Sequence, residues 1–205
     1  MAYVIMAVFA FLALVSCVAS AVPIPSKLFA LRPFGEKFEL FETHEQEGDG
    51  TFSRVATGNF VEATIAQGSG FSGFDSIRIH SSGSAEIVFG NSGEDFRKVE
   101  TKLNPSELEG LFEAFNRDGM HEIKGSYRTR RSDGVQGFVE LVTREGRRFC
   151  RMDNYFEPLQ HTYEYCNRVI VPKLASATLV KGRMDPQAEY HRIFYPEQAR
   201  SRRTR

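Results

Sequence analysis

The chain has 205 residues, with 26 Lys and Arg against 26 Asp and Glu, so its formal net charge is zero. A neutral chain gives no electrostatic reason to expect a nucleic acid as partner, and that class of function is set aside. Phe is abundant, at 18 residues, and Trp is absent, which indicates a core built on Phe and branched aliphatic side chains.

The N-terminal residues predict export. Residues 3–22 contain no charged residue, and a run of this length could span a bilayer as a helix. It ends in the A-x-A pattern of Ala19 to Ala21, which is typical of a processing site. We therefore predict a signal peptide over residues 1–21 and an extracytoplasmic location, secreted or periplasmic. Two alternatives stay open: a lipoprotein with the lipid on Cys17, which ends a Leu-Val-Ser-Cys sequence, and an uncleaved anchor.

The next part of the chain reads as a lead-in followed by strands. Residues 22–35 contain three prolines and form the lead-in. Strand patterns are expected at residues 38–42, 51–56, 59–66, 77–80, 85–89 and 95–102, with turns at 45–50 and 81–84 and a flexible loop at 68–73.

A helix over residues 104–118 is the most clearly marked element. Asn104 is a good N-cap, and Glu107 can complete a capping box. Apolar residues at 108, 111, 112 and 115 form one face, and Gly119 is a natural C-terminal stop.

The second half predicts a hairpin and another helix. An edge segment is expected at 120–127, a hairpin at 138–143 and 147–152, and a helix at about 155–171 that Pro172 ends. The apolar stripe of this helix consists of Phe156, Leu159, Tyr163, Cys166 and Ile170. Residues 175–205 read as a basic, mobile tail. The order of elements predicts an α+β fold with an antiparallel sheet of about 5–7 strands in one domain over residues 36–174.

The succession of these elements resembles small exported bacterial domains of unknown function. The resemblance covers roughly residues 74–172 and rests on the patterns at 84–89, 103–111, 133–134, 138–142 and 146–149. In such domains a strand hairpin is followed by an L-x-x-x-E-L-x-x-L helix and a further hairpin. The resemblance implies a fold and no activity.

Two cysteines remain when Cys17 is removed with the signal. An even pair in an oxidising compartment predicts a disulfide between Cys150 and Cys166. Two alternatives stay open: a pair of buried free thiols, and a reactive Cys150 thiolate between two arginines with His161 as its base.

Charge is unevenly distributed along the chain. Residues 36–62 carry seven acidic residues against two basic ones, and residues 128–151 carry seven Arg against three acidic residues. The two segments are expected to lie near each other or to be solvated. The alternative is an anionic ligand or surface bound by Arg128, Arg130, Arg131, Arg147, Arg148 and Arg151.

Motifs with a defined chemistry are missing from the sequence. The five histidines lack zinc-ligand spacing, neither Gly-Ser loop completes G-x-S-x-G, and there is no phosphate or dinucleotide fingerprint. We expect no metal and no cofactor. The sequence favours an exported, non-catalytic binding or accessory domain whose partner is an unknown protein or an anionic surface, and which reaches a membrane only through a lipid or anchor at its N-terminus. The alternatives are a small extracytoplasmic hydrolase and a protease-inhibitor-like module that offers the loop at 68–73.

Overall fold

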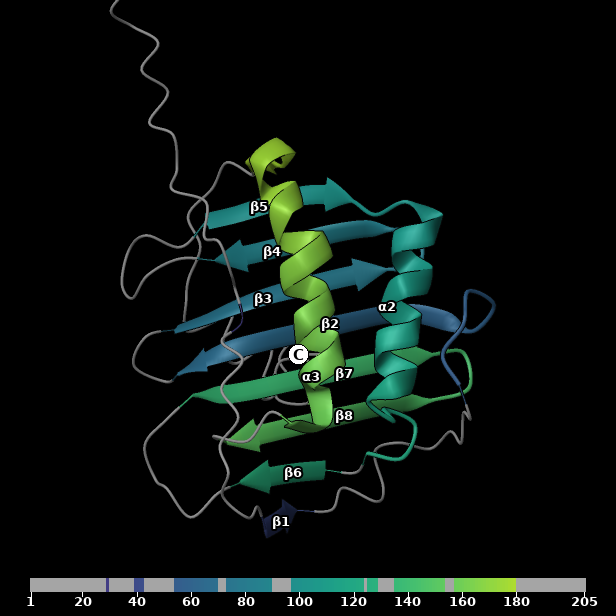
Figure 1. The fold of residues 1–205 in the computed structure, drawn as a ribbon, viewed down its shortest axis with the longest axis vertical. Helices are drawn as coiled ribbons and strands as arrows, with labels where there is room; N and C mark the ends of the chain where they lie inside the picture. Colours follow the sequence, from purple (N-terminus) through teal and green to yellow (C-terminus); the bar gives the residue numbers. More distant parts are fainter. Residues whose placement is uncertain are drawn as a thin grey trace, which may run out of the picture.

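The computed structural model describes Phe29 and residues 39–42, 54–69, 73–89, 97–123, 125–128, 135–153 and 157–179. These residues form one sheet with helices on one of its faces (Figure 1). The strands are β1 (Glu39–Glu42), β2 (Phe60–Ser69), β3 (Gly73–His80), β4 (Ser84–Phe89), β5 (Arg97–Lys102), β6 (Gly125–Arg128), β7 (Gln136–Thr143), β8 (Arg147–Asp153) and β9 (Thr178–Leu179). The predicted signal peptide with Cys17, the residues Arg130 and Arg131, and residues 180–205 of the predicted tail lie outside the described residues.

Within the described ranges the sheet has nine strands, in the order β1-β6-β8-β7-β2-β3-β4-β5-β9. Its six central strands, from β8 to β5, pair antiparallel throughout, which confirms the α+β prediction. Three short strands extend the sheet at its edges, and one of these additions is parallel, because β6 pairs with β8 in the same direction.

The prediction of a strand at residues 51–56 is wrong for residues 54–56, which the structure describes and which are not in a strand. The backbone of Val55 is held by a helix instead: its N–H donates to Asn116 Oδ1 at 2.8 Å, and Asn116 Nδ2 donates to its carbonyl at 2.9 Å. The strand expected at 38–42 is present as β1, but it pairs with β6.

Helix α2 (Pro105–Arg117) follows the sequence prediction closely. Both bonds of the capping box form, because Glu107 N donates to the Asn104 side chain at 3.0 Å and Asn104 N donates to Glu107 Oε2 at 2.7 Å. Gly119 has the positive φ of a helix stop, at +65°. The apolar face of α2 is buried against the sheet.

The second helical segment is less regular than predicted. It consists of η1 (Glu157–Leu159), α3 (Gln160–Tyr165), the π-helix η2 (Cys166–Ile170) and the 3₁₀-helix η3 (Val171–Ser176). Pro172 does not end it, because the proline lies at the start of η3, where its missing N–H is tolerated. The expected stripe is buried at each of its described positions, which are Leu159, Tyr163, Cys166 and Ile170.

The main core lies between the sheet and the two helical segments. It contains Ile65, Ile77 and Ile87 from the sheet and Leu111 and Phe115 from α2. Phe29, from the predicted lead-in, is also part of this core. The predicted lead-in therefore contributes a residue to the folded domain.

Candidate functional site

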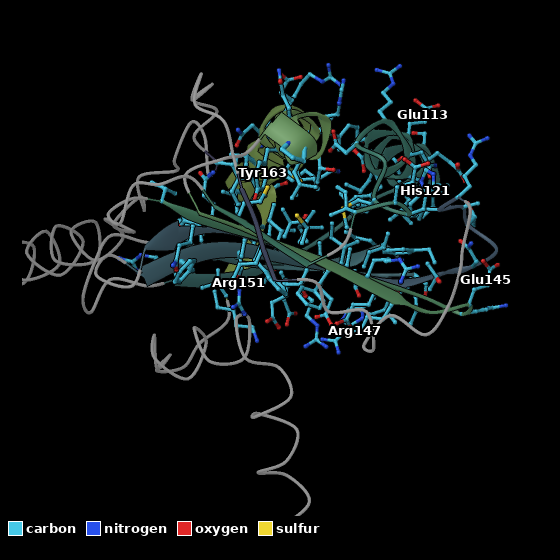
Figure 2. The ribbon with its side chains drawn as sticks, turned by 90° about the horizontal axis from the view of Figure 1, so that it is seen from below. Glu113, His121, Glu145, Arg147, Arg151 and Tyr163 are labelled. Atoms are coloured by element: carbon cyan, nitrogen blue, oxygen red, sulfur yellow. The ribbon has the colours of Figure 1, made fainter. Side chains whose placement is uncertain are left out.

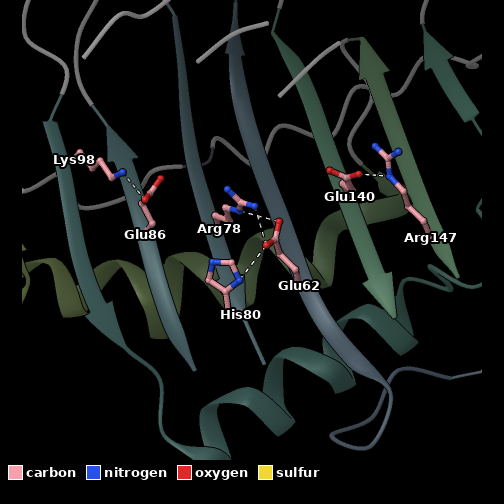
Figure 3. Close-up of polar contacts among 7 residues, drawn as sticks. All are labelled: Glu62, Arg78, His80, Glu86, Lys98, Glu140 and Arg147. Atoms are coloured by element: carbon pink, nitrogen blue, oxygen red, sulfur yellow. Dashed lines mark hydrogen bonds and ion pairs between the residues drawn. The ribbon is translucent and has the colours of Figure 1, made fainter. Parts of the chain in front are cut away.

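The face of the sheet opposite the helices carries the ionisable side chains of the strands. Side chains alternate between the two faces of a strand, so Glu62 and Arg78 point away from the core that contains Ile65 and Ile77. Figure 3 shows these groups in a band across the strands, with both helices behind the sheet. We define the charged face by Glu62, Arg78, His80, Glu86, Lys98, Glu140 and Arg147.

Ion pairs connect neighbouring strands along this band. The Arg78 guanidinium donates to both oxygens of Glu62, at 2.8 and 2.9 Å, and His80 Nδ1 lies 3.0 Å from the same carboxylate. Lys98 Nζ lies 2.5 Å from Glu86 Oε2. The forked geometry of the arginine contact adds specificity as well as energy, because two parallel bonds fix the relative orientation of the groups.

Glu140 and Arg147 form the ion pair at the β7–β8 end of the band. Their side chains are only 12% and 16% exposed, so they are screened by water far less than an ordinary surface pair. Removing one member would leave the other charge partly buried and without this partner, which is the costly case for a salt bridge.

An aromatic cluster adjoins the charged band on the same face. Ala66, Phe74 and Phe138 are buried together, and the partly buried Phe149 packs against them. The rings of Phe138 and Phe149 are stacked with centroids 6.4 Å apart. The sheet therefore buries a second, smaller group of apolar side chains beside the charged residues of this face.

The arginines predicted to bind an anion do not form one cluster. Arg147 and Arg151 point to the charged face (Figure 2), and Arg148, which lies between them along β8, points to the opposite face by the alternation of the strand. In β6, Arg128 is in register with Glu39 on one side and with Asp153 on the other. The acidic and Arg-rich segments thus meet where β1, β6 and β8 pair.

The predicted disulfide is not formed. Cys150 and Cys166 are both free thiols and both fully buried in the main core, where they pack as small apolar side chains. Burial raises the pKa of each thiol well above its ordinary value, and the nearby Asp118 carboxylate raises it further. A buried thiol with a raised pKa opposes the alternative of a reactive Cys150.

Asp118 is a polar residue whose role the sequence did not reveal. Its carboxylate is 1% exposed and accepts hydrogen bonds from the backbone N–H groups of His161, at 3.0 Å, and Thr162, at 2.8 Å. Its Oδ1 also lies 2.8 Å from His161 Nδ1. Burial raises the pKa of Asp118, although the hydrogen bonds from Thr162 and His161 oppose the shift. Asp118 and His161 thus form a structural contact that holds the start of α3, and His161 is directed to Asp118 and not to a thiol.

Among the residues that the structure describes, no group of three or more His, Cys, Asp and Glu side chains is placed to hold a metal ion. Over the same residues, no helix is both long enough and apolar enough to cross a membrane.

No protein-family model matches the chain, and no curated protein matches it either.

Proposed function

We propose that this protein is an exported, non-catalytic binding domain that recognises a partner protein through the charged face of its sheet. The observation that supports this most strongly is the band of ion pairs across six adjacent strands, from Lys98 in β5 to Arg147 in β8, beside an aromatic cluster. Both described helical segments lie on the other face of the sheet, so the side chains of this face are not used to pack them.

The charge pattern favours a protein over a polyanion as partner. Four basic side chains of the charged face have an acidic neighbour: Lys98 has Glu86, Arg78 and His80 share Glu62, and Arg147 has Glu140. A polyanion would have to compete with these carboxylates for each of these four side chains. A protein surface with charges of both signs can match the pattern, and such complementarity governs specificity and association rate more than affinity.

The alternative of a hydrolase has less support from the same residues. The cysteine considered as nucleophile is buried, and the histidine considered as its base is bonded to Asp118. The carboxylates of Glu62, Glu86 and Glu140 are each engaged by a basic side chain.

Site-specific photo-crosslinking tests the proposed binding face. Glu100 is exposed and in register with Glu86, so a photoreactive residue there reports on the charged face. Glu113 is exposed on α2, on the helix side of the sheet (Figure 2), and serves as the matched control. We expect one discrete adduct in extracts of the source cell from position 100 and none from position 113. Equal labelling at both positions would contradict the proposed face.

A charge exchange then separates binding from folding. The double variant Glu62→Arg with Arg78→Glu keeps an ion pair on the same two strands but reverses its direction. We expect the unfolding free energy of the double variant to be closer to that of the wild type than that of Arg78→Glu alone, while the adduct at position 100 is lost. Retention of the adduct in the folded double variant would show that the charge pattern does not select the partner.

Export has its own test. Fractionation and N-terminal sequencing of the protein from its source cell would show a chain that begins at Val22 if the signal is cleaved as predicted. A lipid-modified Cys17 at the N-terminus would indicate the lipoprotein alternative, and an intact N-terminus in the membrane fraction would indicate an anchor. A chain recovered intact from the cytoplasm would overturn export.

A further inference from the structure

Phe29 is bound to the helical layer in the manner of a peptide ligand. Its backbone N–H donates to Asn167 Oδ1 at 3.0 Å, and Asn167 Nδ2 donates to its carbonyl at 2.7 Å. Its ring lies 4.9 Å from that of Tyr163, with the ring planes tilted by 41°. The Phe29 side chain is 0% exposed. One asparagine therefore satisfies both main-chain groups of Phe29, while the core takes up its ring.

The residues that hold Phe29 belong to well-anchored parts of the domain. Tyr163 is fully buried, and its hydroxyl donates to the carbonyl of Ala66 in β2 at 3.2 Å. Asn167 lies in the π-helix η2. A π-helical turn is rare and is found frequently at functional sites, because the extra residue in the turn re-aims the side chains around it.

A second asparagine binds a backbone in the same way and provides an internal comparison. Asn116 makes the corresponding two hydrogen bonds to Val55. Val55 lies shortly before β2, which begins at Phe60, so the sheet helps to hold it in place. Phe29 is separated from Asn167 by 138 residues, and its contacts with Asn167 and Tyr163 are made across that separation.

We propose that Asn167 and Tyr163 form a binding site for the main chain and ring of an aromatic residue in a peptide, and that Phe29 is its resident, separable occupant. Main-chain hydrogen bonds with one side-chain pocket are the means by which many domains recognise extended peptides. This site lies on the helix side of the sheet, so it is independent of the charged face and of the function proposed for it.

The place of the ring in this site can be emptied in the full-length chain and filled from solution. The variant Phe29→Ala removes the resident ring, and the probe is a fluorescent peptide with the sequence of residues 24–34. We expect the peptide to bind Phe29→Ala at least about tenfold more tightly than the wild type, where the resident segment competes. A control peptide with Ala at the position of Phe29 is expected not to bind. Fluorescence anisotropy measures both affinities.

A second substitution tests the role of the asparagine. In the Phe29→Ala background, Asn167→Ala is expected to weaken peptide binding by about tenfold or more, which corresponds to the loss of two backbone hydrogen bonds. Asn116→Ala in the same background removes the similar contact to Val55, and we expect the peptide affinity to stay unchanged.

The outcome is decisive even if Phe29→Ala does not fold alone. In that case the readout is recovery of the circular dichroism spectrum when the peptide is added, and recovery supports the site. The proposal is overturned if the wild type and Phe29→Ala bind the peptide equally, or if the control peptide binds as well as the probe. It is also overturned if Asn167→Ala leaves the peptide affinity unchanged, or if the peptide does not restore the fold of an unfolded Phe29→Ala variant.

Discussion

Asp118 shows how a single side chain can connect distant parts of the chain. It follows α2 directly. Its carboxylate nevertheless accepts hydrogen bonds from the backbone N–H groups of His161 and Thr162 at the start of α3, more than 40 residues later. Without it, these donors would lose their partner at a partly buried helix start. The interaction therefore couples the end of one helix to the beginning of the next.

The ionisation of Asp118 makes a testable contribution to the pH dependence of stability. Burial raises its pKa above the ordinary value of 3.8, against the hydrogen bonds from Thr162 and His161. The folded state thus favours the protonated form, and its stability falls as pH rises through the raised pKa. Asp118→Asn lacks this titration. We expect the unfolding free energy of the variant to increase relative to that of the wild type as pH rises from below 3.8 to neutrality.

Urea unfolding of both proteins over that pH range measures the difference. Glu122→Gln is the control, because the Glu122 side chain is 82% exposed, and its difference from the wild type should be flat. A flat difference for Asp118→Asn as well, or a decrease with rising pH, would mean that burial does not dominate the environment of Asp118.

Local sequence patterns predict some of the side-chain contacts in the structure and not others. The capping box of Asn104 and Glu107 was predictable because its two bonds join residues three positions apart. The contacts of Asp118 with His161 and of Phe29 with Asn167 span 43 and 138 residues. No local pattern specifies such pairs, since they form only when α3 and η2 are placed on the sheet.

At the level of elements, the hairpin of β3 and β4 depends on Gly83. This glycine has φ +82°, and a Cβ there would lie 2.4 Å from the carbonyl oxygen of Leu103. Gly119 also has a positive φ, +65°, but no atom lies within 4 Å of its Cβ position. We expect Gly119→Ala to lose about 1–2 kcal/mol from backbone strain alone and Gly83→Ala to lose more, because strain and collision add. Urea unfolding of the two variants compares them, and an equal loss would show that the backbone moves freely at Gly83.

The packing of α2 against the second helical segment depends on Gly110. A Cβ on this residue would lie 2.7 Å from both Cε2 and the hydroxyl oxygen of Tyr165, whose hydroxyl donates to the Glu107 carbonyl at 2.6 Å. Glycine-to-alanine changes inside exposed helices are stabilising by roughly 1 kcal/mol. We expect Gly110→Ala to be destabilising instead, since Tyr165 has to move.

Thermal unfolding tests the prediction for Gly110, with Gly58→Ala as the control, because no atom lies within 4 Å of the Cβ position of Gly58. Combining Gly110→Ala with Tyr165→Leu should reduce the additional loss caused by the alanine. A stabilised Gly110→Ala variant would mean that the two helical segments can separate without loss.

The elements themselves were predictable where one period or one turn defines them. The hairpins of β3 with β4 and of β7 with β8 were expected because their strands alternate and their turns are short. The second helix was expected as one regular helix, but it is divided by the π-helix η2 and by Pro172. Its apolar stripe has the same spacing in either form, so periodicity could not show the division.

For the whole molecule, the pairing of β2 with β7 decides where the charged face lies. These strands are far apart in the sequence, yet Thr64 is in register with Glu140 and Ala66 with Phe138. The pairing brings the ion pair of Glu140 beside that of Glu62 and completes the aromatic cluster. The alternation of apolar and polar residues in each strand is visible in the sequence, but the order of the strands in the sheet is not. For this reason neither the band of charges nor the division of the arginines between two faces could be predicted.

The state of the two buried cysteines tests how the layers of the molecule fit together. Cys150 lies in β8 and Cys166 in η2, so a disulfide would tie the sheet to its helical layer, whereas the structure has two free thiols in the core between them. Burial raises their pKa, and the native protein should therefore react with a thiol reagent very slowly. In the background Cys17→Ser, we expect two thiols to react as soon as the protein is unfolded in denaturant without a reductant. Reaction only after a reductant is added would mean that Cys150 and Cys166 form a disulfide in the oxidised protein. In an oxidising compartment β8 and η2 would then be joined by a covalent bond in addition to the packing of the core.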